Sequence, residues 1–216
     1  QVIANRNQNN PLKLPSFTYQ SYSKTNFDIE NKTNIIENSL YNQDVYLFIM
    51  ENTSTRKFLY PYHDEEVITA TRVSGLKDPR FGLFATDLQP FSFYENTINL
   101  FDINYINPIS PGAIDNYHYY LEETRYIDRD TLHVISYRPI PGKNFEGLTG
   151  IMQINRKNFA VQSVTAKPFN KPKMEINIKQ LYSQTDTEVW FPEQLHYEIM
   201  TNALPYGKDK DSVKII

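Results

Sequence analysis

Short segments in which apolar and polar residues alternate recur between Asp44 and Thr201, and most of them end in a turn. Alternation with a period of two indicates β-strands with one buried face. The apolar positions are rich in Tyr and Phe, and aromatic residues make up 14% of the chain. The pattern predicts a mainly β protein, a curved antiparallel sheet (half-barrel) with one or two short helices.

In the first half, the alternation predicts a strand over 17–28 and another over 66–74. The near-continuous apolar run over 45–51 is typical of a strand buried on both faces, and residues 56–60 are expected to pair with it. Residues 1–15 contain two prolines, which argue against one continuous helix at the start.

A helix is expected after residue 92, where Ser92 and Glu95 have the spacing of a capping box. Tyr94, Ile98 and Phe101 then follow at helical spacing. These signals predict one short helix over 94–101.

The second half predicts an antiparallel meander, because tight turns separate most of its strand-like segments. Pro192 cannot donate a ladder hydrogen bond, which predicts a bulge or an edge position there. We expect residues 1–216 to form a single domain, cut from a longer protein. The six predicted strands cover 117–127, 131–138, 148–155, 160–166, 173–182 and 188–201.

Composition narrows the class of protein. The net charge is −3 and no Lys/Arg-rich run occurs, so the basic footprint of a nucleic-acid-binding protein is missing. The absence of Cys excludes disulfides, thiolate metal sites and a Cys nucleophile. No apolar run reaches the roughly 18 residues that a membrane-spanning helix requires, so no transmembrane segment is expected within this chain.

Catalytic and metal-binding patterns are weak. The serine-hydrolase elbow and the glycine-rich phosphate loop are absent. Glu122 and Glu123 are expected on opposite faces of one strand, and residues 63–66 in a solvated turn between two strands. No pair of histidines has the short local spacing common in zinc sites. We therefore expect no enzyme, no metal and no cofactor, and ordinary strand or loop roles for His63, His118, His133 and His196.

Aromatic residues crowd around the predicted helix, and they are the one set with a plausible binding role. They either plug the open side of the sheet as core or line an apolar pocket suited to an acyl chain. The candidate ligand-binding residues are Phe81, Phe84, Phe91, Phe93, Tyr94 and Phe101.

Several phrases of the sequence resemble the middle, periplasmic part of an uncharacterised family of Bacteroidota outer-membrane proteins. They lie at 54–58, 72–79 (Arg-Val-Ser-Gly-Leu-Lys-Asp-Pro), 89–94 (Gln-Pro-Phe-Ser-Phe-Tyr) and 137–147. The resemblance implies an N-terminal carboxypeptidase-regulatory-like domain and a C-terminal outer-membrane barrel in the same polypeptide. It also implies a periplasmic location, tethered to the outer membrane through the parent protein.

The order of strands and turns in the second half, with Trp190-Phe191-Pro192 near its end, resembles the periplasmic lipoprotein-carrier fold. That resemblance implies a half-barrel around an apolar cavity, without catalysis. The favoured hypothesis is a non-enzymatic periplasmic domain that binds an apolar ligand, a lipid or a lipoprotein on its concave face. The alternative is a structural or protein-interaction module that docks other envelope components through its sheet edges.

Overall fold

The structure is a computed structural model that describes residues 1–29, 48–61, 63–75, 91–127, 130–170, 174–206 and 211–216. Within these ranges the chain is mainly β, with one α-helix, two short 3-10 helices and twelve strands. The paired strands run antiparallel, and the described sheets are not closed into a barrel. The predicted mainly β, antiparallel fold class is confirmed.

The chain divides into two compact units. Unit 1 comprises Gln1–Leu14, Gln89–Pro172 and Ile176–Tyr197, and unit 2 comprises Pro15–Leu88, Lys173–Glu175 and Glu198–Ile216. The prediction of a single domain over 1–216 therefore stays a prediction.

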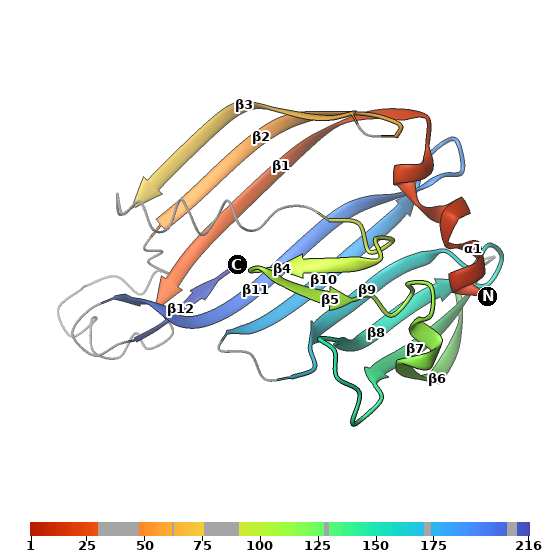
Figure 1. The fold of residues 1–216 in the computed structure, drawn as a ribbon. Coiled ribbons are helices and arrows are strands. Elements are labelled where there is room, and N and C mark those ends of the chain that lie inside the picture. Colours follow the sequence, from red (N-terminus) through yellow and green to blue (C-terminus); the bar gives the residue numbers. More distant parts are fainter. Residues whose placement is uncertain (30–47, 62, 76–90, 128–129, 171–173, 207–210) are drawn as a thin grey trace. The chain divides into compact units, whose positions relative to one another are not determined.

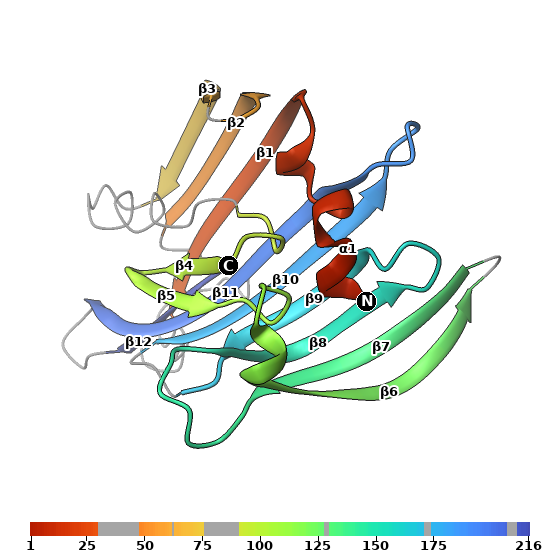
Figure 2. The same ribbon diagram turned by 45° about the vertical axis from the view of Figure 1, so that its right-hand side comes forward.

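Unit 1 holds a sheet with the strand order β11-β10-β9-β8-β7-β6 and a separate β4–β5 hairpin. Figures 1 and 2 show the hairpin beside this sheet. Its elements are α1 (Val2–Asn9), η1 (Pro11–Lys13), β4 (Thr97–Leu100), β5 (Ile103–Ile106), η3 (Ala113–Asp115), β6 (Tyr117–Ile127), β7 (Asp130–Pro139), β8 (Leu148–Asn155), β9 (Val161–Pro168), β10 (Glu175–Gln184) and β11 (Trp190–Tyr206).

The core of unit 1 lies between one face of this sheet and the segment 91–113. Along β10 burial alternates strictly from Glu175 to Gln180, as expected for a strand with one buried face. The segment contributes the fully buried Tyr105 and Ile109. The sheet contributes buried residues from each of its strands, including Tyr137, Leu148, Met152, Val164, Ile178 and Trp190.

Unit 2 holds strands in the order β3-β2-β1-β12-β11. The new elements are β1 (Ser16–Ile29), β2 (Phe48–Leu59), β3 (His63–Gly75) and β12 (Asp211–Ile215). The long β1–β2 ladder keeps one register from Ser16 opposite Leu59 to Phe27 opposite Phe48. The 17-residue strand β11 contributes residues to both units.

All six strands predicted for the second half form, with bounds that shift by a few residues at most ends. These strands could be predicted because they are joined by tight antiparallel connections. The alternation of apolar and polar residues and the positions of the turn residues then indicate the same strand ends. The strand predicted over 17–28 is also confirmed as β1.

The helix predicted over 94–101 is wrong. Part of the capping box forms, since Ser92 N donates to Glu95 Oε1 (3.1 Å), while Ser92 Oγ accepts from Tyr94 N (3.2 Å) and not from Glu95 N. These bonds close a single turn, which leads directly into β4. The β4–β5 turn has positive φ at both Phe101 (50°) and Asp102 (63°), as in a two-residue hairpin. The capping pattern determines only the turn at 92–95. The conformation of the residues after it is determined by the pairing of β4 with β5.

Two details of the first half also differ from expectation. Residues 48–51 and 56–59 belong to one continuous strand, β2, and do not pair with each other. The polar residues between them are mainly Thr and Ser, which strands tolerate well. Residues 63–66 begin β3 and are not a turn.

Candidate functional site

The six predicted aromatic residues have different environments. Phe81 and Phe84 lie outside the described residues. Phe91 and Phe101 are half-buried, while Phe93 and Tyr94 are 0% and 1% exposed. The burial of Phe93 and Tyr94 favours the alternative that these two rings belong to the core, and the pocket stays a prediction.

Phe93 is fixed through its backbone. Its N–H donates to Tyr182 OH (2.8 Å) and to Gln180 Oε1 (3.2 Å), and its carbonyl accepts from Asn107 Nδ2 (2.7 Å). Its ring lies 6.5 Å from that of Tyr137. Buried backbone groups need hydrogen-bond partners. The two bonds from Phe93 N therefore hold the segment 91–113 against β10.

Tyr94 is held as firmly. Its hydroxyl accepts from Val161 N (2.8 Å), and its ring packs edge-on against Tyr182 at 5.6 Å. Burial raises the pKa of Tyr94, so the phenol stays neutral. The guanidinium of Arg6 donates to the carbonyl of Tyr94 and to Asn96 Oδ1 (2.6 Å), which joins α1 to this turn.

The four histidines lie in different surroundings. His133 Nδ1 lies 3.1 Å from Thr124 Oγ1, and the His118 ring lies 6.2 Å from that of Tyr120. His63 and His196 are exposed. Across the described residues, no three His, Asp or Glu side chains gather as they would around a metal ion.

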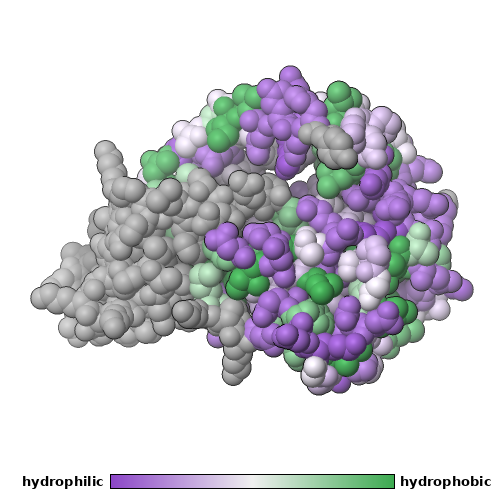
Figure 3. Space-filling model, viewed as in Figure 1, coloured by the Kyte–Doolittle hydropathy of each residue, from purple (hydrophilic) through white to green (hydrophobic). Residues whose placement is uncertain are grey.

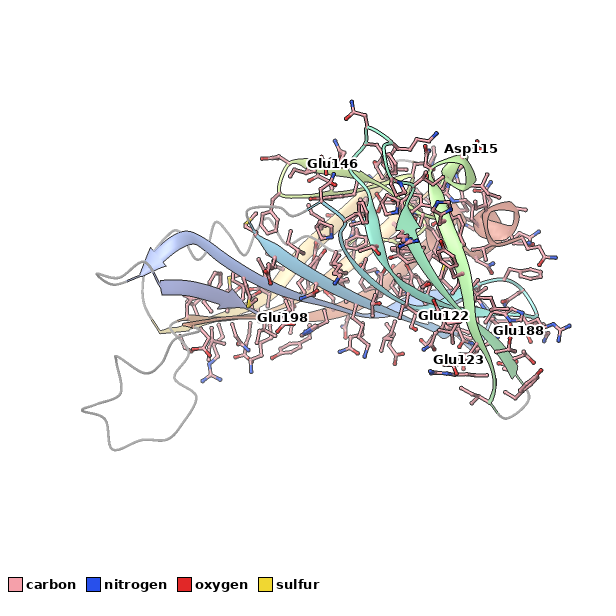
Figure 4. All side chains as sticks on the ribbon, turned by 90° about the horizontal axis from the view of Figure 1, so that it is seen from below. Asp115, Glu122, Glu123, Glu146, Glu188 and Glu198 are labelled. Carbon is pink, nitrogen blue, oxygen red and sulfur yellow. The ribbon has the colours of Figure 1, made fainter. Side chains whose placement is uncertain are left out.

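Glu122 and Glu123 share one face of the sheet, which corrects the expectation that alternation would separate them. Leu121 pairs with Ile135 and Glu123 with Val134, so Glu122 is the extra residue of a β-bulge. Glu122 accepts a hydrogen bond from Ser136, while Glu123 accepts from Arg125. Figure 4 shows both carboxylates along β6, away from Asp115 and Glu146.

Unit 2 presents a surface that the sequence did not single out. We call it the aromatic face: the face of β1, β2 and β3 that carries two aromatic pairs, one at each end. Phe17 stacks on Phe58 with 4.8 Å between ring centroids. At the other end, Phe27 packs edge-on against Phe48 at 5.4 Å.

A polar row lies between the aromatic pairs. Arg56 forms a two-pronged ion pair with Asp64, with 2.7 Å from Nε to Oδ1. This bond lowers the pKa of Asp64. Ser54 Oγ donates to Glu66 Oε1 (2.5 Å) and lies 2.7 Å from Ser21 Oγ. The aromatic face is therefore amphipathic.

Strand β3 stays exposed along its whole length, from His63 to Gly75. On the aromatic face Ile68 is 61% and Val73 52% exposed, and on the opposite face Val67 is 48% exposed. Figure 3 shows apolar residues among polar ones over the visible, coloured surface. In the described sheet, exposed apolar side chains therefore gather on the edge strand β3.

Comparison with known proteins identifies the family. Residues 1–209 match the sequence model of a family described as "Family of unknown function (DUF5686)". The chain belongs to this family. No curated protein matches it. The match agrees with the resemblance to an uncharacterised family, whereas the Bacteroidota origin and the N-terminal domain stay predictions.

Three solved structures show low similarity to the chain. A DUF1329 family protein from Desulfovibrio piger has 9% identity and a TM-score of 0.36, over 99% of this chain and 87% of that one. The LolA superfamily protein NE2245 from Nitrosomonas europaea has 10% identity and a TM-score of 0.34, over 99% and 88%. A putative outer-membrane lipoprotein-sorting protein domain from Vibrio parahaemolyticus has 9% identity and a TM-score of 0.30, over 91% and 82%.

The described part of the chain contains no helix of the length and apolarity needed to cross a membrane.

Proposed function

We propose that the chain is a non-enzymatic, periplasmic binding module, tethered to the outer membrane through its parent protein, that holds an apolar ligand or a lipidated partner on the aromatic face of unit 2. The observation that carries the proposal is the exposure of Ile68 and Val73 on β3. They continue the aromatic face beyond the buried Phe48 and Phe58.

The chemistry of this face suits an amphipathic ligand. The exposed aliphatic side chains offer contact to an acyl chain. The intervening Arg56, Ser54 and Glu66 offer hydrogen bonds to a polar group of the ligand. Half-buried Met50 lies opposite Val73. Its flexible side chain adds an apolar contact that can adapt to acyl chains of different length.

Docking through the sheet edges has less support. In the described sheets, the edge strand of unit 2, β3, has a bulge at Thr69, and the edge strand of unit 1, β6, has one at Glu122. Both strands also carry charged residues. Bulges and charges are the devices by which proteins block edge-to-edge pairing. Metal-assisted catalysis has no support from the described residues either, because no three of their His, Asp or Glu side chains gather in one place.

The first test is mass spectrometry of an organic-solvent extract of the purified protein. We expect fatty acid or phospholipid in near-stoichiometric amount. Binding of a fluorescent fatty acid by the delipidated protein then gives an affinity. Ile68→Asp places a charge on the aromatic face and should weaken binding about tenfold or more, because a carboxylate beside an acyl chain is poorly solvated.

Val67→Asp is the matched control. Val67 is the preceding residue of the same exposed strand, but it lies on the opposite face, across from Thr55. It should leave the affinity unchanged. A lipid-free extract together with no binding of the fluorescent fatty acid would refute the proposal, as would equal effects of the two substitutions.

A further inference from the structure

One face of the unit 1 sheet, opposite its core, carries a continuous row of residues across five strands. The register places Tyr120 opposite Ser136, Ser136 opposite Ile151, Ile151 opposite Thr165, and Thr165 opposite Lys179. Residues directly opposite one another project from the same face of a sheet. The row therefore extends from the edge strand β6 to β10.

A second row lies two residues further along these strands. His118 pairs with Arg138, and Thr149 pairs with Lys167. With Lys179 from the first row, the face thus holds three permanent cations and one histidine. We call this surface the basic face, and Arg138, Lys167 and Lys179 are all exposed on it.

Among the described residues, these cations have no acidic partner. Within the described part of the chain, the ion pairs join other residues, and none includes Arg138, Lys167 or Lys179. Arg138 lies over the ring of Tyr120, with 5.4 Å from its guanidinium carbon to the ring centroid. The described carboxylates on this face of β6–β10 are Glu122, which is bonded to Ser136, Glu123, which is paired with Arg125, and Glu175 at the start of β10.

The basic face contrasts with the whole chain, whose net charge is −3. Neighbouring strands lie about 5 Å apart, so Arg138 on β7 and Lys167 on β9 are separated by about 10 Å between backbones. Like charges at this spacing repel unless an anion lies between them. This arrangement favours an extended anionic partner over one small ion.

Apolar residues are interleaved with the cations. Tyr120, at the β6 edge of the basic face, is 45% exposed, and Ile151, on β8 in its middle, is 44% exposed. A tyrosine ring favours the boundary between lipid headgroups and hydrocarbon, where its apolar body and polar hydroxyl are both satisfied. A soluble polyanion would make no use of Ile151, whereas a bilayer surface would.

We propose that the basic face binds the surface of a lipid bilayer that carries anionic headgroups. Arg138, Lys167 and Lys179 attract the headgroups, and Tyr120 and Ile151 enter the interfacial region. This surface belongs to unit 1 and is distinct from the aromatic face of unit 2. The orientation it imposes turns the outer side of the sheet of β6–β10 toward the membrane.

Sedimentation with lipid vesicles tests this inference. The full chain should bind vesicles of phosphatidylcholine with phosphatidylglycerol, and should not bind pure phosphatidylcholine. Binding should fall steeply when salt is added. The double variant Lys167→Glu/Lys179→Glu should bind at least about tenfold more weakly, because each cation near an anionic membrane contributes attraction.

A matched control changes the net charge equally at another place in unit 1. Arg156→Glu/Lys157→Glu alters two exposed cations in the turn after β8, at the opposite end of that strand from Thr149. It should leave binding nearly unchanged. Equal weakening by both double variants would overturn the proposal, since only net charge would then matter. Failure to bind anionic vesicles would also overturn it.

The variant Ile151→Ser separates a membrane from a soluble anion. On a bilayer it should weaken vesicle binding while leaving the interaction with tripolyphosphate unchanged. Two results together would show that the partner is a soluble polyanion and that the membrane proposal fails. Tripolyphosphate would displace the protein from the vesicles at stoichiometric concentration, and Ile151→Ser would have no effect on vesicle binding. Fatty-acid binding by the aromatic face is measured without vesicles, so the two proposals fail independently.

Discussion

Three buried or half-buried tyrosines of unit 1 donate their hydroxyl groups to backbone carbonyls. Tyr137 OH donates to Thr165 O (2.9 Å), Tyr119 OH to Pro108 O (2.7 Å) and Tyr117 OH to Ile106 O (2.5 Å). Burial raises the pKa of Tyr117 to about 12, so the phenol is neutral at physiological pH. These bonds let large polar rings fill a core without leaving an orphaned hydroxyl group.

Gly150 is needed for the close approach of β8 and β9. A Cβ atom there would lie 1.9 Å from the backbone oxygen of Thr165 and 3.0 Å from Tyr137 OH. Gly150→Ala should therefore lower the free energy of unfolding by at least about 2 kcal/mol, as overpacking against a backbone does. Urea denaturation measures this. Ile151→Ala, at the next and exposed position, should cost only about 0.5 kcal/mol, and a similar cost at both positions would contradict the clash.

The Arg56–Asp64 ion pair makes stability depend on pH in one direction. The hydrogen bond from Arg56 lowers the pKa of Asp64 in the folded chain. Asp64 therefore stabilises the fold above its unfolded pKa of about 4, and this contribution disappears as the pH falls through the lower, folded pKa. Between neutral pH and about pH 3, the melting temperature of Asp64→Asn should fall less than that of the wild type.

The control for this pH experiment is Asp186→Asn, in the exposed β10–β11 turn. Asp186 forms no ion pair among the described residues. This variant should follow the wild-type melting curve as the pH is lowered. If Asp64→Asn and the wild type lose stability in parallel, the ion pair does not contribute to acid unfolding.

The strand elements were predictable where alternation and turn residues agreed. The segment 117–127 was read correctly to its ends because Tyr117, Tyr119 and their neighbours alternate and a turn follows. The bulge at Glu122 could not be predicted from the sequence. The extra residue of a bulge shifts the following side chains to the other face of the sheet, but it leaves no mark in the composition of the strand. The capping box at Ser92 forms in part, but the residues after Glu95 gain more from pairing as β4 and β5 than from a short isolated helix.

The β4–β5 hairpin offers a test of its turn. Asp102 has a φ of 63°, a region that costs a non-glycine residue energy. Asp102→Gly should raise the free energy of unfolding by about 0.5 kcal/mol, since glycine adopts this conformation without strain. Thr97→Gly, in the exposed first position of β4, should lower it by about 1 kcal/mol. Thermal or urea unfolding would show whether the two substitutions have opposite signs.

The candidate site was harder to predict than the fold. Phe93 and Tyr94 were found by their aromatic character, but aromatic character does not separate a pocket wall from a core. Ile68 and Val73 carry the proposed ligand surface because β3 has a neighbour on one side only in the described sheet. That property depends on strand order, which local alternation does not specify.

In the whole molecule, the central question is whether the two units unfold together. The chain passes between the units several times, and β11 contributes Trp190 to unit 1 and Ile199 to unit 2. Unfolding either unit would therefore leave part of one continuous strand without its neighbours. Since unpaired backbone groups are costly, we expect a single cooperative transition, as for one domain.

The fluorescence of the only tryptophan can distinguish one cooperative transition from independent unfolding of the two units. Trp190 is 7% exposed and lies in unit 1, so its fluorescence reports on that unit, whereas far-UV circular dichroism reports on the strands of both. Phe58→Ala removes a buried ring from unit 2 and should cost about 3 kcal/mol or more. In a cooperative molecule it shifts the fluorescence midpoint in urea as far as the dichroism midpoint, while exposed Lys57→Ala shifts neither. A fluorescence midpoint that stays at the wild-type value would mean two independently stable domains, and binding by each unit could then be assayed on separate fragments.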